Sequence, residues 1–480
     1  MKEHTFYING RWEENLDGRV MDNRNPATNA VFARVHTAGP QDLERALTAA
    51  DDAFGRWSTA LAAERERILL QAACRLEDMQ EEAVSLLIEE SGSTWQKAQG
   101  EVLGSIAVLR TAAGECRRVG GEVYAPTSQD NLSFSIRCPL GVVLAIAPFN
   151  YPLLLALKKV AYALAAGNAV LLKPASATPL SGLLIARIFH DAGLPAGVLN
   201  VLPCPGALIG RQLVEDPRVK AVTFTGSSEA GRQIAQQAAR HLKRCTMELG
   251  GKNPMIVLAD YDVEQAAHLA GYGAFFHQGQ VCMATSRIIV EKPSYSAFCE
   301  QMKKRAEGLK VGDPRERDTV IGPLIDEAQC EVIDRQIQDA VKKGARLLTG
   351  GHHTGPFYAP TVLADVTPEM DIFQQESFGP VTSVICAEDA EDALALCNNN
   401  CYGLSAALLT NDLRKALSLS MRMESGKVHV NDTTFVSGTV APSGGFKLSG
   451  TGKEGGHYSI EEFTELKWIT IQYKDRRMPC

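Results

Sequence analysis

Hydrophobic positions fall on one face of a helix through much of the first quarter of the chain. This helical spacing begins at residue 42 and continues to about residue 118, which predicts a long helical region. Ahead of it, residues 6–12 predict a small hairpin, because Asn9-Gly10 suits a turn that needs positive φ. Over residues 132–138 apolar and polar side chains alternate, which is typical of a half-exposed strand.

From residue 141 onward, short apolar runs alternate with helical segments. The predicted strands of the first series are 141–147, 169–172, 198–202, 220–225 and 244–247. The predicted helices between them are 153–166, 178–192, 207–215 and 228–240. A second series has strands near 254–258, 286–290, 346–348, 382–385 and 427–430. This alternation predicts an α/β protein with parallel sheets covered by helices. A last strand, 467–473, has no obvious partner near it in sequence.

Composition and charge narrow the class of protein. The chain has 480 residues, of which 45% are hydrophobic and 22% charged, so we expect two or three globular domains. A net charge of −7 disfavours nucleic acid or an anionic membrane as the main partner. The N-terminus lacks the apolar core of a signal peptide and the most apolar stretch is broken by prolines and lysines, so a cytoplasmic protein is expected. The twelve cysteines lack paired spacing, so we expect neither a disulfide framework nor a metal site.

Two segments offer the groups needed for covalent catalysis. Cys282 ends the run Gly279-Gln280-Val281-Cys282, which places a thiol on a glycine-bearing turn. Glu248 ends a predicted strand and is followed by Leu249-Gly250-Gly251, where two residues have no side chain to block approach. A cysteine nucleophile and a carboxylate that activates water are the minimum for forming and hydrolysing an acyl-enzyme. A single cysteine is more often a buried hydrophobe, so the remaining motifs matter.

Three further strand ends carry polar groups. Gly226 and Ser227 open a helix after a strand, where backbone N–H groups can approach a pyrophosphate. Lys173 ends another strand and could hold a ribose or phosphate, and Asn150 could present an amide to a developing oxyanion. Each of these signals is weak by itself, because glycine turns, solvated lysines and turn asparagines are common.

In combination and in this order, the motifs resemble the aldehyde dehydrogenase superfamily. The motifs are Pro148-Phe149-Asn150-Tyr151-Pro152, Lys173-Pro174-Ala175-Ser176, Phe224-Thr225-Gly226-Ser227, Met247-Glu248-Leu249-Gly250-Gly251-Lys252, Gly279-Gln280-Val281-Cys282, Glu376-Ser377-Phe378-Gly379-Pro380 and Gly444-Gly445-Phe446-Lys447-Leu448-Ser449-Gly450. The resemblance extends from the N-terminal hairpin to the final strand.

The resemblance implies a fold and an assembly. It implies a Rossmann-like cofactor domain from residues 1–120 and 141–249 and an α/β catalytic domain from 250–447. Residues 121–140 and 448–480 would form a β oligomerisation arm and C-terminal tail. A homodimer or homotetramer is therefore expected, because an unpaired terminal strand can add to a neighbouring subunit's sheet.

The resemblance also implies roles for individual residues. Cys282 would attack the aldehyde, and Asn150 would hold the oxyanion together with the Cys282 N–H. The hydride would then pass to NAD or NADP. Glu248 would activate water to hydrolyse the resulting thioester. The positions that match cofactor contacts are Lys173, Glu376, Phe378, Gly226, Ser227 and Gly231. Lys159 matches a lysine near the active site whose role stays open.

Departures from the family pattern bear on cofactor and substrate. Ser176 stands where NAD-preferring members carry Glu, so repulsion of a 2′-phosphate is removed and NADP should be tolerated. Ser443 replaces an aromatic that borders the substrate tunnel, and Phe149 belongs to the same region. Lys158 stands where succinate-semialdehyde dehydrogenases have an arginine, although their second arginine is Phe276 here.

These departures predict an aldehyde with a short polar or anionic tail, such as a semialdehyde. The alternative for Lys158 is a solvated lysine on an amphipathic helix. An aromatic aldehyde is the alternative substrate, because segments 109–114 and 462–468 are similar to vanillin and salicylaldehyde dehydrogenases. A coenzyme A-acylating enzyme and a binding protein without turnover are also considered; Glu248 disfavours the first, and Cys282, Glu248 and Asn150 together disfavour the second.

Overall fold

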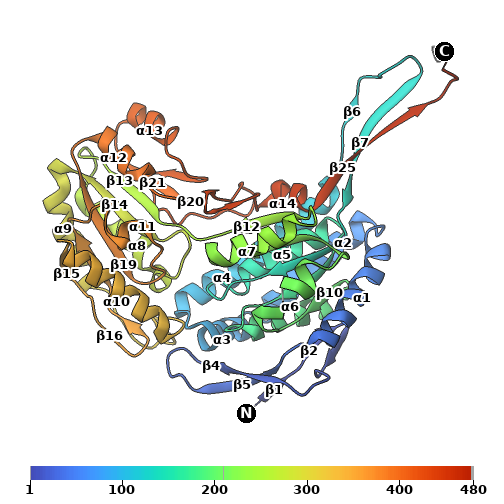
Figure 1. Ribbon diagram of the computed structural model, residues 1–480, viewed down its shortest axis with the longest axis horizontal. Helices are drawn as coiled ribbons and strands as arrows, with labels where there is room; N and C mark the ends of the chain where they lie inside the picture. Colours follow the sequence, from blue (N-terminus) through green and yellow to red (C-terminus); the bar gives the residue numbers. More distant parts are fainter. Residues whose placement is uncertain (1, 209, 477–480) are drawn as a thin grey trace.

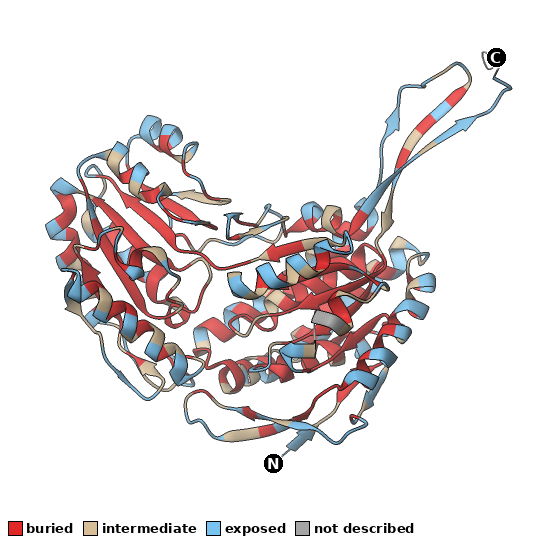
Figure 2. Ribbon diagram, in the orientation of Figure 1, coloured by how far each residue is buried: buried red, intermediate tan, exposed pale blue. Residues whose placement is uncertain are grey.

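The computed structural model describes residues 2–208 and 210–476 and folds them into two lobes and a projecting arm (Figure 1). Each lobe is built around one sheet. The strand order is β24-β12-β11-β8-β9-β10-β2-β3 in the first sheet and β15-β18-β19-β14-β13-β21-β22 in the second. Figure 2 shows the buried strands at the centre of each lobe and exposed residues on the outer helices.

The first lobe contains the predicted parallel series. Its parallel strands are β8 (Val142–Ile146), β9 (Ala169–Lys173), β10 (Leu199–Val201), β11 (Val219–Thr225) and β12 (Arg244–Glu248). The connecting α-helices include α5 (Leu154–Ala165), α6 (Pro179–Asp191) and α7 (Ser228–Ala239). Every residue of β8 and β9 is buried, as expected for strands covered on both faces.

The N-terminal region adds a hairpin and four helices to this lobe. The predicted hairpin is confirmed as β2 (Phe6–Ile8) and β3 (Arg11–Glu13), with positive φ at Asn9 and Gly10. The helical region consists of α1 (Pro40–Trp57), α2 (Ala62–Asp78), α3 (Gln80–Ser91) and α4 (Trp95–Glu115). A separate sheet of β1 (Lys2–His4), β5 (Val31–His36) and β4 (Val20–Arg24) was not predicted.

One predicted helix of the first lobe is wrong in type. In place of an α-helix over 207–215, the chain forms a 3-10 turn, Gly206–Leu208, and a π-helical turn, Gly210–Val214. These two turns contain Gly206 and Gly210, and glycine disfavours a regular α-helix.

The main sheet of the second lobe has five strands at predicted positions and two that the sequence did not reveal. The predicted strands are β13 (Asn253–Val257), β14 (Thr285–Glu291), β15 (Arg346–Thr349), β19 (Val381–Ala387) and β22 (Val428–Val430). The additional strands are β18 (Thr361–Ala364) and β21 (Ala406–Leu409), each of four residues. The main helices of this lobe are α8 (Val263–Phe275), α9 (Lys292–Glu307), α10 (Glu327–Lys342), α12 (Ala390–Asn398) and α13 (Leu413–Ser420).

The chain crosses between the lobes next to the candidate catalytic segments. It leaves the first sheet at Glu248, the last residue of β12, and enters the second sheet at Asn253, the first residue of β13. It returns through β24 (Gly450–Thr451), which pairs with β12 at the edge of the first sheet. Glu248 therefore lies where the two lobes meet.

The arm supplies the partner that the final strand lacks in the sequence. β25 (Thr464–Gln472) pairs antiparallel with β7 (Asn131–Pro139) along its whole length, and β6 (Val123–Tyr124) pairs with the other edge of β7. The resulting ribbon projects from the first lobe, and many of its residues are exposed (Figures 1 and 2). Across the described ranges of the chain, no helix combines the length and apolarity needed to cross a membrane.

Candidate active site

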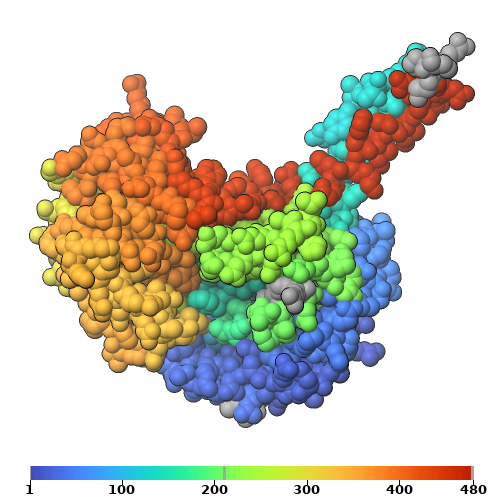
Figure 3. Space-filling model, in the orientation of Figure 1, coloured from blue at the N-terminus to red at the C-terminus, as the bar shows by residue number. Residues whose placement is uncertain are grey.

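A cleft of 820 Å³ lies where the lobes meet and collects most of the predicted site residues. Figure 3 shows the surface on which green segments of the first lobe face yellow and orange segments of the second. The predicted residues that line the cleft are Phe149, Asn150, Lys173, Ser176, Gly226, Ser227, Glu248, Cys282, Glu376 and Phe378. Residues predicted to bind cofactor therefore share one cavity with the candidate nucleophile and base.

Three predicted residues do not line this cleft. Gly231 is buried within α7, where a Cβ would lie 2.4 Å from Leu249 Cδ2, so it allows α7 to pack on the segment after β12. Lys158 and Ser443 lie near the catalytic residues but outside the cleft lining.

The turn that carries Cys282 is tightly packed. Gly279 has φ of +69°, and a Cβ there would lie 2.1 Å from the carbonyl oxygen of Gly379. The backbone carbonyl of Cys282 accepts a hydrogen bond of 2.8 Å from Asn253 Nδ2 at the start of β13. Gly251 is close as well, because its Cβ would lie 2.7 Å from the same carbonyl. These contacts hold the nucleophile turn against the strand that leads away from Glu248.

Cys282 is a half-buried thiol in a mixed electrostatic environment. Burial raises its pKa to about 11, while the positive charges of Lys427 and Lys158 act in the opposite direction. The carboxyls of Glu376 and Glu248 raise the pKa further. At neutral pH Cys282 is therefore protonated in the free protein and must lose its proton when it reacts.

The buried carboxyl group of Glu248 has few neighbouring groups that stabilise its charge. Its Oε1 is buried and has no hydrogen-bond partner among the described residues. Burial raises the pKa of Glu248 to about 8, and the nearby Glu454 adds to the increase, while Lys427, Lys159 and Lys158 oppose it. A carboxyl group that titrates near neutral pH is suited to exchanging protons with water.

The buried neighbours of Glu248 include an ion pair that the sequence left without a role. Lys159 Nζ lies 2.6 Å from Glu454 Oε1 and 3.2 Å from Thr223 Oγ1. Glu454 is also paired through its backbone with Ser443, at 2.7 Å in both directions. This ion pair links α5 to the segment that carries Ser443.

Asn150 is positioned by residues that sequence reasoning missed. Its Nδ2 donates to the carbonyl of Gln280 at 2.9 Å, and its own carbonyl accepts from Lys97 Nζ at 2.6 Å. Lys97 also pairs with Glu101, whose Oε1 accepts from the backbone N–H of Leu153. In the sequence, a Lys–Glu pair spaced i,i+4 on a helix indicates a surface salt bridge. The packing of α4 on α5 buries this pair.

The cofactor side of the cleft fits a dinucleotide. Gly226 and Ser227 precede α7, and Ser227 Oγ accepts from Ala230 N, so the N-terminus of a three-turn helix faces the cleft. Lys173 contributes a cation from the end of β9. Glu376 accepts from Gly251 N at 3.0 Å, and Gly250 leaves room for it, because a Cβ at residue 250 would lie 2.4 Å from Glu376 Oε2. Donors for phosphate and acceptors for ribose thus line a single cavity.

Aromatic side chains narrow the cleft near the nucleophile. Phe149 and Phe378 meet edge to face, with ring centroids 5.7 Å apart. Phe378 has φ of +48°, which for a bulky residue marks a backbone held by its surroundings.

Lys158 is a buried residue, and the alternative of a solvated lysine is wrong. Its side chain is 6% exposed, because α5 is buried over nearly all of its length. Lys427, which the sequence did not single out, precedes β22 in the second lobe and donates to Ser443 Oγ at 3.1 Å. A lysine within a short apolar strand segment is the only sequence signal that could have indicated Lys427.

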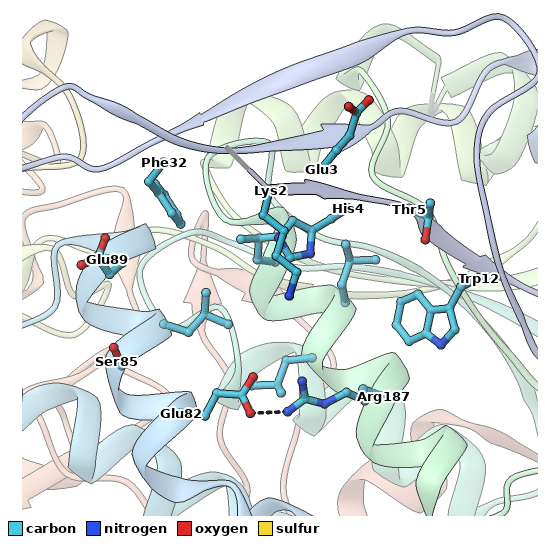
Figure 4. A pocket seen from close by; sticks show the side chains of 14 residues that line it. Lys2, Glu3, His4, Thr5, Trp12, Phe32, Glu82, Ser85, Glu89 and Arg187 are labelled. Carbon is cyan, nitrogen blue, oxygen red and sulfur yellow. Dashed lines mark hydrogen bonds and ion pairs between the residues drawn. The ribbon is translucent and has the colours of Figure 1, made fainter.

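A second hollow, of 690 Å³, lies apart from these residues at the N-terminal sheet (Figure 4). It is lined by Lys2, His4 and Trp12 and closed on one side by the ion pair between Arg187 and Glu82. None of the predicted site residues contributes to it.

Comparison with known proteins identifies the family. Residues 12–469 match the model of the aldehyde dehydrogenase family. The chain is 41% identical to a vanillin dehydrogenase of Pseudomonas fluorescens over 96% of both chains, and 38% identical to a 3-sulfolactaldehyde dehydrogenase of Priestia aryabhattai over 98% of both. A solved salicylaldehyde dehydrogenase from Pseudomonas putida G7, complexed with salicylaldehyde, superimposes with a TM-score of 0.98 at 36% identity over the whole of both chains.

The chain belongs to the aldehyde dehydrogenase family. It has the aldehyde dehydrogenase fold and is an NAD(P)-dependent oxidoreductase that acts on aldehydes.

Proposed function

We propose that this enzyme oxidises an aldehyde with a polar or anionic tail, such as a semialdehyde, to the carboxylic acid through a thioester on Cys282. The observation that carries the proposal is the burial of Lys158 on α5, where its positive charge lowers the pKa of both Cys282 and Glu248, since a buried cation that acts on the reacting groups favours an anionic substrate. One relative is named for 3-sulfolactaldehyde, an aldehyde with a sulfonate group, and this name agrees with an anionic tail.

In the first half of the proposed reaction, the thiol of Cys282 releases its proton to solvent water and its sulfur attacks the aldehyde carbon. Asn150 supports the developing oxyanion, because within the described residues its amide nitrogen donates one hydrogen bond, to the carbonyl of Gln280, and has a second hydrogen to offer. Lys173, Ser227 and Glu376 would hold the nicotinamide cofactor in the cleft, where it would supply the acceptor for the hydride. The acyl group that remains on the Cys282 sulfur then forms a thioester.

In the second half, Glu248 removes a proton from water as the water oxygen attacks the thioester carbon. The C–S bond breaks, the carboxylic acid leaves and the Cys282 sulfur regains a proton. The unpaired Oε1 of Glu248 is free to bind this water. A water-activating carboxylate supports hydrolysis over transfer of the acyl group to coenzyme A.

NADP is the cofactor that the site favours or at least accepts as well as NAD. Ser176 is exposed at the cleft, so no carboxylate at that position repels a 2′-phosphate. The lobe of the first sheet would hold the cofactor, the lobe of the second sheet would carry the nucleophile, and the arm would join subunits.

A neutral aromatic aldehyde is the second candidate substrate. It is supported by the names of the vanillin and salicylaldehyde relatives and by the half-exposed rings of Phe276 and Phe435, which stack with centroids 5.2 Å apart. Both rings come from segments that flank Cys282 in space.

A homodimer or homotetramer is the proposed assembly. β25 is an edge strand of the arm and exposes apolar side chains, among them Leu466 and Trp468, which are 56% and 63% exposed. Exposed apolar residues on an open edge favour pairing with another copy of the chain.

A panel of aldehydes assayed with NAD and with NADP tests the function. We expect NAD(P)H formation with succinate semialdehyde to exceed that with benzaldehyde in kcat/KM. Cys282→Ala should abolish turnover and leave folding and cofactor binding intact, as measured by circular dichroism and calorimetry. Appreciable turnover by Cys282→Ala would contradict the assignment of the nucleophile.

A further inference from the structure

Lys427 is a cation without a carboxylate partner next to the nucleophile. It immediately precedes β22, and its Nζ lies 3.1 Å from Ser443 Oγ and 2.8 Å from the sulfur of Met283. Met283 follows Cys282 directly in the chain. In the described part of the chain Lys427 forms no salt bridge, so a neutral hydroxyl and a thioether are the side chains that contact its ammonium group.

Lys158 places a second unpaired cation close by. Like Lys427, it forms no salt bridge with any described residue, in contrast to its neighbour Lys159, which is paired with Glu454. Burial and the charge of Lys158 both lower the pKa of Lys427, so the two ammonium groups are near enough to repel each other. The charges of Cys282, Glu248 and Glu454 act in the opposite direction and raise the pKa of Lys427, but none of these groups forms a salt bridge with either lysine among the described residues. A bound anion would give the two lysines a direct ion pair.

Met283 also packs against an aromatic cluster. Met283 packs with Tyr151, Phe276 and Phe435, which form one apolar cluster with Val281 and Ala284. The rings of Tyr151 and Phe435 lie 6.3 Å apart, and Phe276 stacks on Phe435. Phe276, Phe435 and Met283 are all half-exposed, so these groups have surface left to contact a ligand. Aromatic rings with free faces and edges favour a planar aromatic partner.

We propose that the preferred substrate is an aromatic aldehyde that carries an anionic substituent on its ring, with Lys427 and Lys158 binding the anion. Phe276 and Phe435 would contact the ring while the formyl carbon reaches Cys282. This inference rests on the proposed oxidation of an anionic aldehyde and adds the ring and the role of Lys427. It accounts for the contact of one residue, Met283, with both a lysine and an aromatic cluster.

Steady-state kinetics with 3- and 4-formylbenzoate, benzaldehyde and succinate semialdehyde test the proposal. We expect the better of the two formylbenzoates to exceed both other substrates in kcat/KM by at least about 10-fold. Lys427→Met keeps the length of the side chain and removes its charge. It should lower the ratio of kcat/KM for formylbenzoate to that for benzaldehyde by about 10- to 100-fold, mainly through KM, as loss of a charge-assisted contact would. Lys158→Met should act in the same direction.

Lys304→Met is the matched control, because Lys304 is exposed on α9, away from the site. This variant should keep the wild-type ratio. Binding of the product dianions isophthalate and terephthalate to Cys282→Ala, measured by calorimetry, gives a readout that needs no turnover. The additional substitution Lys427→Met should weaken that binding by a similar factor.

The proposal would be overturned if Lys427→Met left the formylbenzoate-to-benzaldehyde ratio of kcat/KM unchanged, or if it left the affinity for the product dianions unchanged. A preference for succinate semialdehyde over both formylbenzoates would show that the preferred substrate has no aromatic ring, but it would still agree with oxidation of an anionic aldehyde. A preference for benzaldehyde over every anionic aldehyde would remove that function as well.

Discussion

The ionisation of Glu248 should set the pH dependence of thioester hydrolysis. Since its pKa is raised to about 8, the carboxyl group is mostly protonated below that pH and cannot accept a proton from water. When hydrolysis limits turnover, kcat should therefore rise with pH through about 8. A pH profile that is flat from 6 to 9 in the wild type would contradict this role.

Glu248→Gln should separate the two halves of the reaction. We expect a burst of about one NAD(P)H per active site, followed by slow turnover, because acylation does not need the carboxylate whereas hydrolysis does. Stopped-flow absorbance measures the burst. Glu300→Gln, at an exposed site on α9, should keep normal steady-state turnover. Normal turnover in Glu248→Gln would exclude Glu248 as the base, and turnover restored by coenzyme A would favour acyl transfer.

Ser176 should control the choice between NADP and NAD. In Ser176→Glu, repulsion between the carboxylate and the 2′-phosphate should weaken NADP relative to NAD by about 1–3 kcal/mol, or roughly 5- to 150-fold. Ser176→Gln has a similar size without the charge and should shift the ratio far less. Binding constants for both cofactors from fluorescence titration decide the question. An unchanged ratio in Ser176→Glu, or strict use of NAD by the wild type, would contradict the expectation.

At the scale of a single element, the turn before Cys282 depends on glycine at residue 279. A methyl group there would meet the Gly379 carbonyl at 2.1 Å, and φ of +69° disfavours any other residue. Gly279→Ala should therefore destabilise the fold by about 1–3 kcal/mol and lower activity by displacing the nucleophile. Thermal unfolding and kcat measure the two effects.

Gly100→Ala in α4 is the matched control for this turn. Nothing lies within 4 Å of the position of its Cβ, and its φ is not positive, so alanine should be neutral or stabilise the helix by about 0.5–1 kcal/mol. Equal effects of the two substitutions would show that the turn tolerates a side chain.

At the scale of the whole molecule, the arm should govern self-association. Leu466→Glu places a charge on the exposed face of β25, so it should shift the assembly toward smaller species in sedimentation velocity experiments. Leu413→Glu, at a residue that is 82% exposed on α13 of the other lobe, is the control and should leave the assembly unchanged. A wild-type chain that sediments as a monomer, or an arm substitution without effect, would argue against this interface.

The sequence by itself determined the elements whose pattern is local. Buried strands such as β8 and β9 have apolar residues on both faces, and the Asn9-Gly10 turn defines its hairpin through positive φ, so neither needs distant partners to be recognised. The motifs around Cys282, Glu248 and Asn150 were equally local, and they indicated the family because their order along the chain matches it. Strands β18 and β21 were missed, and only their pairing with β19 and β13 places them in the second sheet.

Only the tertiary structure decided which side chains share an environment. It placed β25 against β7, some 330 residues away in sequence, and it buried the Lys97–Glu101 pair beneath Asn150. It also brought Lys427 to Met283, a contact that nothing in the sequence indicated, and it buried Lys158, for which the sequence left a solvated position open as the alternative. The physical reason is that desolvation and charge pairing depend on every element packed around a group, whereas sequence periodicity reports only the element on which the group lies.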